Sequence, residues 1–318
     1  MLDLLARSGC PYIFKGGTCV GLILGESTRR LSIDIDIICP PGTNVEEYLG
    51  KIREFGFTRT ELVERQQAGK DVPKSHSKLF YQIAYTDRVN QESYILLDVL
   101  YEDAHYHKVN EVDVVNHFIE LDSEPSRVRV PSIGDILGDK LTAFAPNTTG
   151  IPYYKKGKSR ATEIMKQVYD IGRLFEAVEN LDITRQSFNR IALVELGYRN
   201  LEAAPSIICE DVRQTALLLA TRGQEGRGEF SLLQDGVKRL SSFIYQNKYY
   251  IEDAIADSAK AAYVATCIEK GVEKVCKYSS DNLRLDMTIG KVLSPKLNKL
   301  KKIRPEAFYY WWLIDNML

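Results

Sequence analysis

The stretch that decides the fold covers residues 15–37 and reads KGGTCVGLILGESTRRLSIDIDI. It follows a short β-rich run at residues 12–14, which predicts a strand that ends in the Gly-Gly pair. A helix is predicted from about residue 18 to 24, with Gly25 as its end. Residues 31–38 then alternate polar and apolar side chains, which is typical of a strand with one buried face. Strand, glycine turn, helix and strand in this order predict a small α/β sheet.

The pattern changes near residue 130. Residues 1–130 predict an α/β (α+β) domain with a mixed sheet of about four or five strands. The remaining elements expected in it are a helix between residues 44 and 56, strands at 78–86 and 93–101 joined by a turn at 87–90, and a strand at 127–130. Residues 131–318 predict a mostly α-helical domain, because their apolar spacing is helical. Its expected helices span about 132–144, 160–178, 184–202, 205–222, 229–247, 250–270 and 305–317.

The composition limits the possible classes of protein. The chain has 318 residues, with 42 Lys or Arg against 43 Asp or Glu, so its net charge is −1. This excludes a chain that is basic overall, although local patches decide nucleic-acid binding. No run approaches the roughly 18–20 apolar residues of a membrane span, and the first residues lack a secretory layout. Six scattered cysteines without a CxxC motif predict free thiols. We therefore expect a cytoplasmic protein.

Asp34 and Asp36 are the most informative polar residues. Residues two apart on a strand point to the same side, so these carboxylates would project together while Ile33, Ile35 and Ile37 enter the core. Adjacent carboxylates repel each other unless a cation lies between them, and Mg²⁺ is the natural cation for carboxylate and phosphate oxygens. The alternative is an edge strand whose acids face water.

The glycine pair upstream favours the metal-binding interpretation. Glycines let the backbone approach a ligand, and the N–H groups at a helix start attract phosphate. A carboxylate pair beside a phosphate cradle is what metal-dependent phosphoryl or nucleotidyl transfer requires.

The same run resembles the signature of the polymerase-β-type nucleotidyltransferase superfamily. More closely it resembles the AbiEii/AbiGii toxin family, which reads roughly KGGT…R-x-S-x-D-h-D-h. The matching positions are Lys15, Gly16, Gly17, Thr18, Arg29 or Arg30, Ser32, Asp34 and Asp36. Residues 139–143 (DKLTA) and 169–171 (YDI) resemble two later family segments, so the resemblance covers about residues 12–180. Lys166 and Gln167 stand where the last segment has Arg-Asp, and only its second acid, Asp170, is retained.

The resemblance implies roles for these residues. Asp34 and Asp36 would hold Mg²⁺ in a site for one or two metal ions. Lys140 would offset the negative charge that develops on the phosphates of the NTP substrate. The residues implied in nucleotide binding are Lys15, Gly16, Gly17, Thr18, Arg30, Ser32 and Lys140. Ser32 is alternatively a target for inactivation by modification, or simply a strand-entry serine.

Two further acids have alternative interpretations. Asp98 lies in an apolar run that predicts a buried strand. It would be a third metal-binding carboxylate that activates the attacking hydroxyl, or a buried acid paired with a basic side chain. Asp170 would orient Lys140 or complete the catalytic site, or it would be a helix-surface acid paired with Lys166 or Arg173.

Three other segments carry weaker signals. Residues 153–160 (YYKKGKSR) mix aromatic and basic side chains, which suits nucleic-acid binding or a solvated loop. Residues 296–304 (KLNKLKKIR) form a second basic run on a predicted helix. The aromatic residues 308–312 are expected in the core or at a partner surface, with RNA binding as the second interpretation. His105 and His107 have no third ligand nearby, so no zinc site is predicted, and the histidines at 76 and 117 carry no signal.

The resemblance implies Mg²⁺-dependent transfer of NMP from an NTP to an acceptor hydroxyl, with release of pyrophosphate. By family analogy the acceptor is the 3′ end of tRNA, the effect is growth arrest in a toxin–antitoxin or abortive-infection system, and the partner is a cognate antitoxin. Two alternatives stay open. The acceptor could be a small molecule, such as an aminoglycoside, or a protein side chain. The chain could also be an inactive binding module, of which Lys166 and Gln167 would be signs.

Overall fold

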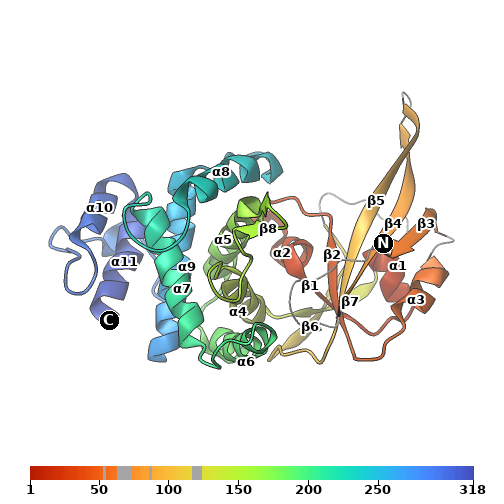
Figure 1. Ribbon diagram of the computed structural model, residues 1–318, viewed down its shortest axis with the longest axis horizontal. Helices are drawn as coiled ribbons and strands as arrows, with labels where there is room; N and C mark the ends of the chain where they lie inside the picture. The colour runs from red at the N-terminus through yellow and green to blue at the C-terminus, as the bar shows by residue number, and fades with distance from the viewer. Residues whose placement is uncertain (53–54, 63–73, 86–87, 117–123) are drawn as a thin grey trace. The chain divides into compact units, whose positions relative to one another are not determined.

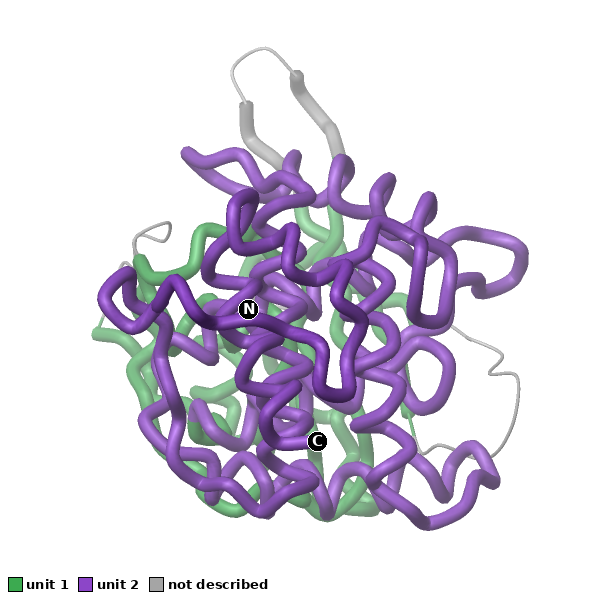
Figure 2. Tube along the Cα trace, turned by 90° about the vertical axis from the view of Figure 1, so that its left-hand side faces the viewer, with its two compact units in different colours: residues 1–132 green, residues 133–318 purple. Residues whose placement is uncertain are grey.

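The computed structural model describes residues 1–52, 55–62, 74–85, 88–116 and 124–318. The chain folds as two compact units, unit 1 over Met1–Ser132 and unit 2 over Ile133–Leu318 (Figure 2). All six cysteines lie in the described part as free thiols. No described helix combines the length and the apolar character needed to cross a membrane. His117 lies outside the described residues.

Unit 1 contains a five-stranded mixed sheet, as predicted. Its strands lie in the order β1 (Ile13–Lys15), β2 (Ile35–Cys39), β5 (Arg88–Tyr101), β4 (Lys74–Tyr85) and β3 (Phe57–Leu62). Strands β2 and β5 are parallel, and the other pairs are antiparallel. The helices of the unit are α1 (Leu2–Arg7), α2 (Gly16–Leu24) and α3 (Val45–Ile52), and a separate ribbon consists of β6 (Val109–Asp113) and β7 (Arg127–Pro131). Figure 1 shows α2 running beside β1 and β2.

The core of unit 1 follows the register of the strands. Phe14 on β1 lies opposite Ile37 on β2, and Ile37 is the register partner of Val99 on β5. Leu79 and Leu97 extend this layer, and all five side chains are at most 2% exposed. Each fully buried side chain of this size contributes about 1.5–3 kcal/mol, so this layer fixes the register of the central strands.

The predicted strand at residues 31–38 is too long at its start. Strand β2 begins only at Ile35, and Ile33, predicted to enter the core, is 73% exposed. Residues 31–34 join neither neighbouring strand: the ladder with β5 begins only at Ile35 opposite Leu97, and β1 ends at Lys15, where Gly16 has φ +80° and turns the chain into α2. The ladder between β1 and β2 therefore stops at the pair Lys15 and Asp36, and α2 begins two residues earlier than expected.

Strands β4 and β5 are longer than predicted. The ladder between them runs from Lys74 opposite Leu100 to Tyr85 opposite Arg88, so residues 88–90, expected in a turn, belong to β5. The rest of that predicted turn, residues 86–87, lies outside the described part. The extension matters because it brings His76 into β4.

Unit 2 is mostly α-helical, as predicted. Its helices are α4 (Ile133–Ala143), α5 (Ala161–Ala177), α6 (Asp182–Tyr198), α7 (Ser206–Ala220), α8 (Phe230–Leu240), α9 (Ile251–Lys270), α10 (Leu300–Ile303) and α11 (Pro305–Met317). Helix α9 is the centre of the unit, because every residue from 254 to 268 is buried and α5, α7 and α11 pack against it. Its many alanines let these helices approach closely.

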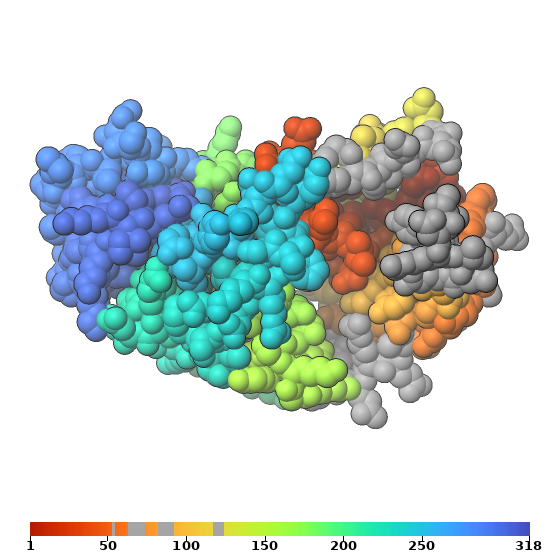
Figure 3. All heavy atoms as spheres, turned by 90° about the horizontal axis from the view of Figure 1, so that it is seen from above, coloured from red at the N-terminus to blue at the C-terminus, as the bar shows by residue number. Residues whose placement is uncertain are grey.

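The C-terminal aromatic residues are core residues, which confirms the first of their two interpretations. Phe308, Tyr310 and Trp311 on α11 are at most 1% exposed. The ring of Tyr310 lies 5.3 Å from that of Phe175 and 5.4 Å from that of Tyr263, centroid to centroid. The blue C-terminal segment forms a continuous part of the surface of unit 2 in Figure 3, while these aromatic side chains point inward.

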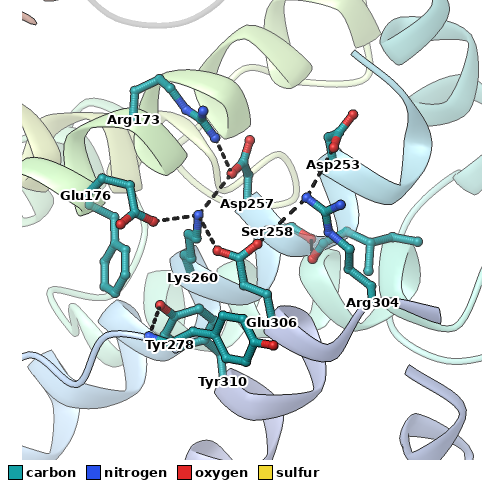
Figure 4. Close-up of polar contacts among 12 residues, drawn as sticks. Arg173, Glu176, Asp253, Asp257, Ser258, Lys260, Tyr278, Arg304, Glu306 and Tyr310 are labelled. Atoms are coloured by element: carbon teal, nitrogen blue, oxygen red, sulfur yellow. Dashed lines mark hydrogen bonds and ion pairs between the residues drawn. The ribbon is translucent and has the colours of Figure 1, made fainter. Parts of the chain in front are cut away.

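A buried network of charges joins α5, α9 and α11 (Figure 4). Lys260, with 4% of its side chain exposed, places Nζ 2.7 Å from Glu176, 2.8 Å from Glu306 and 3.6 Å from Asp257. Arg173 also contacts Asp257, at 3.0 Å. Burial by itself would lower the pKa of Lys260, but the three carboxylates outweigh it and raise this pKa. Lys260 is therefore charged, and together with Arg173 it neutralises the buried carboxylate of Asp257.

Replacing this lysine tests the network. Lys260→Met is expected to lower the free energy of unfolding by about 3 kcal/mol, because it removes a buried cation shared by three carboxylates, of which that of Asp257 is itself buried. Urea unfolding followed by helical circular dichroism measures the change. The control is Lys238→Met, whose exposed pair with Asp235 should be worth less than about 1 kcal/mol. Equal effects of the two substitutions would contradict a structural role for the network.

Candidate active site

The glycine turn lies directly against two charged side chains. A Cβ atom added at Gly16 would lie 2.0 Å from Oδ2 of Asp36, and one added at Gly17 would lie 2.2 Å from Nη2 of Arg30. Gly16 also has φ +80°, a conformation that other residues rarely adopt. Lys15, the N-cap residue of α2, has no side-chain acceptor with which to cap the first N–H groups of that helix. The helix start thus combines backbone donors with a carboxylate and a buried guanidinium.

The residues before β2 are tied to the same helix. The hydroxyl of Thr18 donates a hydrogen bond to the main-chain carbonyl of Asp34, at 2.5 Å. Asp34 is exposed and precedes β2, and Ser32 is half-buried two residues further upstream. The prediction that both aspartates lie on one strand is therefore wrong for Asp34, because β2 starts after it. Asp34 is held by the first turn of α2 instead of by the sheet.

A row of polar residues crosses the sheet of unit 1. In register, Lys15 on β1 lies opposite Asp36 on β2, Asp36 beside Asp98 on β5, and Asp98 opposite His76 on β4. Register partners project from the same face of a sheet, so four side chains from four strands form one line. Asp98 is thus both a carboxylate beside Asp36 and an acid paired with a basic side chain. Its contact with His76, Oδ1 to Nδ1, is 2.6 Å.

The sequence reasoning missed His76. The predicted strand began at residue 78, four residues after the start of β4, so this histidine lay outside it. Had the strand been extended, the alternation of His76, Lys78 and Phe80 would have placed the histidine on one face of the sheet. The long-range pairing with Asp98 was the missing signal.

Unit 2 contains a second polar cluster on α4 and α5. Lys140 Nζ lies 2.9 Å from Asp170 Oδ2 and 3.0 Å from Gln167 Oε1. Lys140 is 7% exposed and Asp170 is fully buried, so the alternative of a helix-surface acid is wrong. Asp170 is the ion-pair partner of Lys140, and Gln167 supplies a neutral acceptor at the position where the expected acid is missing. That both units contribute to one catalytic site stays a prediction.

The acids of unit 1 fit a divalent cation in their donor chemistry. No three Asp, Glu, His or Cys side chains within the described ranges stand close enough together to form a metal site by themselves. Mg²⁺ usually takes only one or two protein carboxylates and fills its other positions with water and substrate phosphate. Neighbouring Asp36 and Asp98, with Asp34 just before the strand, match that requirement. Which ion binds stays a prediction.

The basic segment at residues 153–160 is an ordered hairpin of β8 (Tyr154–Lys155) and β9 (Lys158–Ser159). Lys156 and Gly157 form its turn, both with positive φ, as a two-residue hairpin turn requires. Tyr153 anchors the hairpin because its hydroxyl lies against Gly228, while Tyr154 is 49% exposed.

The second basic run, residues 296–304, is partly neutralised, since Lys296 pairs with Glu225 and Arg304 with Asp253.

Comparison with known families identifies the class of protein. The family model of the nucleotidyl transferase AbiEii toxin of type IV toxin–antitoxin systems matches residues 3–243. Because this match spans most of the chain, the protein belongs to the AbiEii family of nucleotidyltransferase toxins. The predicted family and enzyme class are thus confirmed. No curated protein matches the chain.

Several solved structures are similar to this one. JHP933 from Helicobacter pylori is 17% identical, with 85% of this chain and 88% of that chain covered and a TM-score of 0.46. MenT4, a nucleotidyltransferase toxin from Mycobacterium tuberculosis H37Rv, is 13% identical, with 96% and 85% covered and a TM-score of 0.47. At these values the likeness carries no argument about individual residues.

The buried pair of Lys140 and Asp170 allows stability and activity to be separated. Lys140→Met is expected to destabilise the protein by about 3–5 kcal/mol, because it leaves the Asp170 carboxylate buried without its cation. Adding Asp170→Leu removes that charge, so the double variant should recover most of the stability and still lack activity. Urea unfolding and a nucleotide-transfer assay measure the two properties. A stable double variant with normal activity would exclude Lys140 from catalysis.

Proposed function

We propose that this toxin transfers NMP from an NTP to the 3′ end of a tRNA in a Mg²⁺-dependent reaction. Family membership supplies the reaction class, and the metal and the acceptor are the proposal. The observation that carries it is the register pairing of Asp36 with Asp98, beside a glycine turn on which Asp36 lies. This is a carboxylate pair next to a helix start, the combination that phosphate and a hard cation require.

In this proposal the polar residues of unit 1 have separate roles: some bind the triphosphate and others hold the metal. The N–H groups at Gly16–Thr18 and the Arg30 guanidinium bind the triphosphate, with Lys15 and Ser32 as further phosphate contacts. Asp34, Asp36 and Asp98 hold the metal, which when bound neutralises phosphate charge. Asp98 also accepts the proton of the attacking hydroxyl. The acceptor oxygen bonds to the α-phosphorus, the bond from this phosphorus to the β-phosphate oxygen breaks, and pyrophosphate leaves.

Lys140 of unit 2 completes the proposed set. Its ammonium group offsets the negative charge that develops on the leaving pyrophosphate, and Asp170 orients it. The pair's burial supports this role, because a lysine held by two acceptors keeps one position during the reaction. A lysine on an exposed helix face would have no such fixed position.

The hairpin at residues 154–159 supports a nucleic-acid acceptor. Lys155, Lys156 and Lys158 are exposed on it next to the exposed ring of Tyr154, so it presents three cations and a stacking surface. Such a combination binds phosphates and unpaired bases, and its binding weakens with salt. A cognate antitoxin is the expected protein partner, because the family belongs to toxin–antitoxin systems.

A labelling assay tests the proposal. The protein is incubated with total RNA, Mg²⁺ and each α-³²P-labelled NTP in turn, and label is expected in tRNA with at least one nucleotide. Removing Mg²⁺ with EDTA should abolish the signal. Asp36→Asn should lower the rate by about 100-fold or more, because a metal-binding charge is lost. The matched control is Asp103→Asn, which changes an exposed acid of the same unit.

Each contrary outcome points to a different alternative. Label on protein without label on RNA would favour a side-chain acceptor, and label on an added aminoglycoside alone would favour a small molecule. An Asp36→Asn variant with unchanged transfer would refute the assigned site. A wild-type protein that binds all four NTPs but transfers none would favour the inactive binding module.

A further inference from the structure

His76 stands at the end of the polar row and contacts Asp98 closely. The distance of 2.6 Å between Nδ1 and Oδ1 is short even for a charge-assisted hydrogen bond, which is usually about 2.7–2.9 Å. An ionised carboxylate only accepts hydrogen bonds, so Nδ1 of His76 is the donor. The contact therefore requires a proton on Nδ1 of the imidazole.

The surroundings of this contact favour a fixed geometry. The side chain of His76 is 11% exposed and that of Asp98 is 27% exposed, so the imidazole is more deeply buried than the carboxylate that it contacts. Both residues lie inside long strands whose ladder continues on either side of them. The histidine is therefore positioned by the sheet, and water competes weakly for its donor.

Asp98 lies between two different neighbours. On one side is Asp36, the adjacent residue on β2, and on the other is His76 on β4. Neighbouring strands are about 4.8 Å apart, so the two carboxylates repel each other and Asp98 would tend to rotate away. A donor that binds Oδ1 opposes this rotation and thereby sets the direction of the second oxygen.

We propose that His76 is a positioning residue for the transfer reaction: its Nδ1–H holds the Asp98 carboxylate in the orientation in which it accepts the proton of the attacking hydroxyl. This inference rests on the proposed function, because it takes the role of Asp98 from there. It adds a residue to the site that lies on neither the glycine turn nor the aspartate strand.

Two substitutions at residue 76 separate positioning from packing. His76→Ala removes the donor and is expected to lower kcat by about 10–100-fold, with the KM for NTP changed by less than about threefold. His76→Asn keeps an N–H donor at the position nearest to Nδ1 and should recover most of kcat. The control is His107→Ala, which removes an exposed histidine and should leave kcat unchanged. Urea unfolding of each variant confirms that it is folded.

Nitrogen NMR gives a readout that does not depend on activity. The chain has four histidines, so ¹⁵N-histidine labelling yields few signals, and His76→Asn identifies the one from His76. This signal is expected to show the Nδ1–H tautomer, and Asp98→Ala should abolish that preference. A wild-type protein that transfers no nucleotide would refute the proposed function, while the tautomer still reports on the contact.

Three results would overturn the inference. The first is a folded His76→Ala variant with wild-type kcat. The second is an equal loss of activity in Ala and Asn variants of wild-type stability. The third is an Nε2–H tautomer for His76 in the wild-type protein, since that form cannot donate to Asp98 from Nδ1.

Discussion

The close contact between the Asp36 carboxylate and the main chain of Gly16 is the constraint on which the rest of unit 1 depends. Only a glycine leaves room there, because any Cβ would overlap Oδ2 of Asp36. The same glycine ends β1 after three residues and starts α2, so it decides where the ladder between β1 and β2 stops. One residue thereby fixes both the end of a strand and the position of the acid beside the helix start.

The parallel pairing of β2 with β5 places a second carboxylate, that of Asp98, beside Asp36. These strands are the only parallel neighbours in the described sheet, and their register sets Asp36 beside Asp98. A shift of one residue would turn Asp98 to the opposite face and replace it with an apolar neighbour. The buried layer of Ile37, Leu97 and Val99 opposes such a shift, because these side chains would then leave the core. The hydrophobic register of the sheet thus maintains the acidic pair.

Local features of the fold could be predicted from the sequence, and long-range ones could not. The glycine turn, the helices of unit 2 and the buried aromatic tail follow from patterns within a few residues. The alternation around Ile33 failed as a predictor because a strand also needs a partner. Strand β1 ends too early to supply one, and the ladder with β5 begins only at Ile35. Similarly, the role inferred for His76 depends on its contact with Asp98, which lies 22 residues away along the chain. Neither the missing strand partner nor the contact with Asp98 can be read from the residues next to these positions in the sequence.

The cluster around Lys140 shows why a departure from a family pattern need not mean lost function. A buried lysine requires acceptors, and Asp170 and Gln167 both provide one. With one positive and one negative charge, the three side chains sum to zero, whereas an aspartate at position 167 would make the sum −1. A neutral cluster repels a triphosphate less than a negative one does. In the proposed mechanism, Gln167 therefore keeps a contact with Lys140 without adding a negative charge that would oppose an anionic substrate.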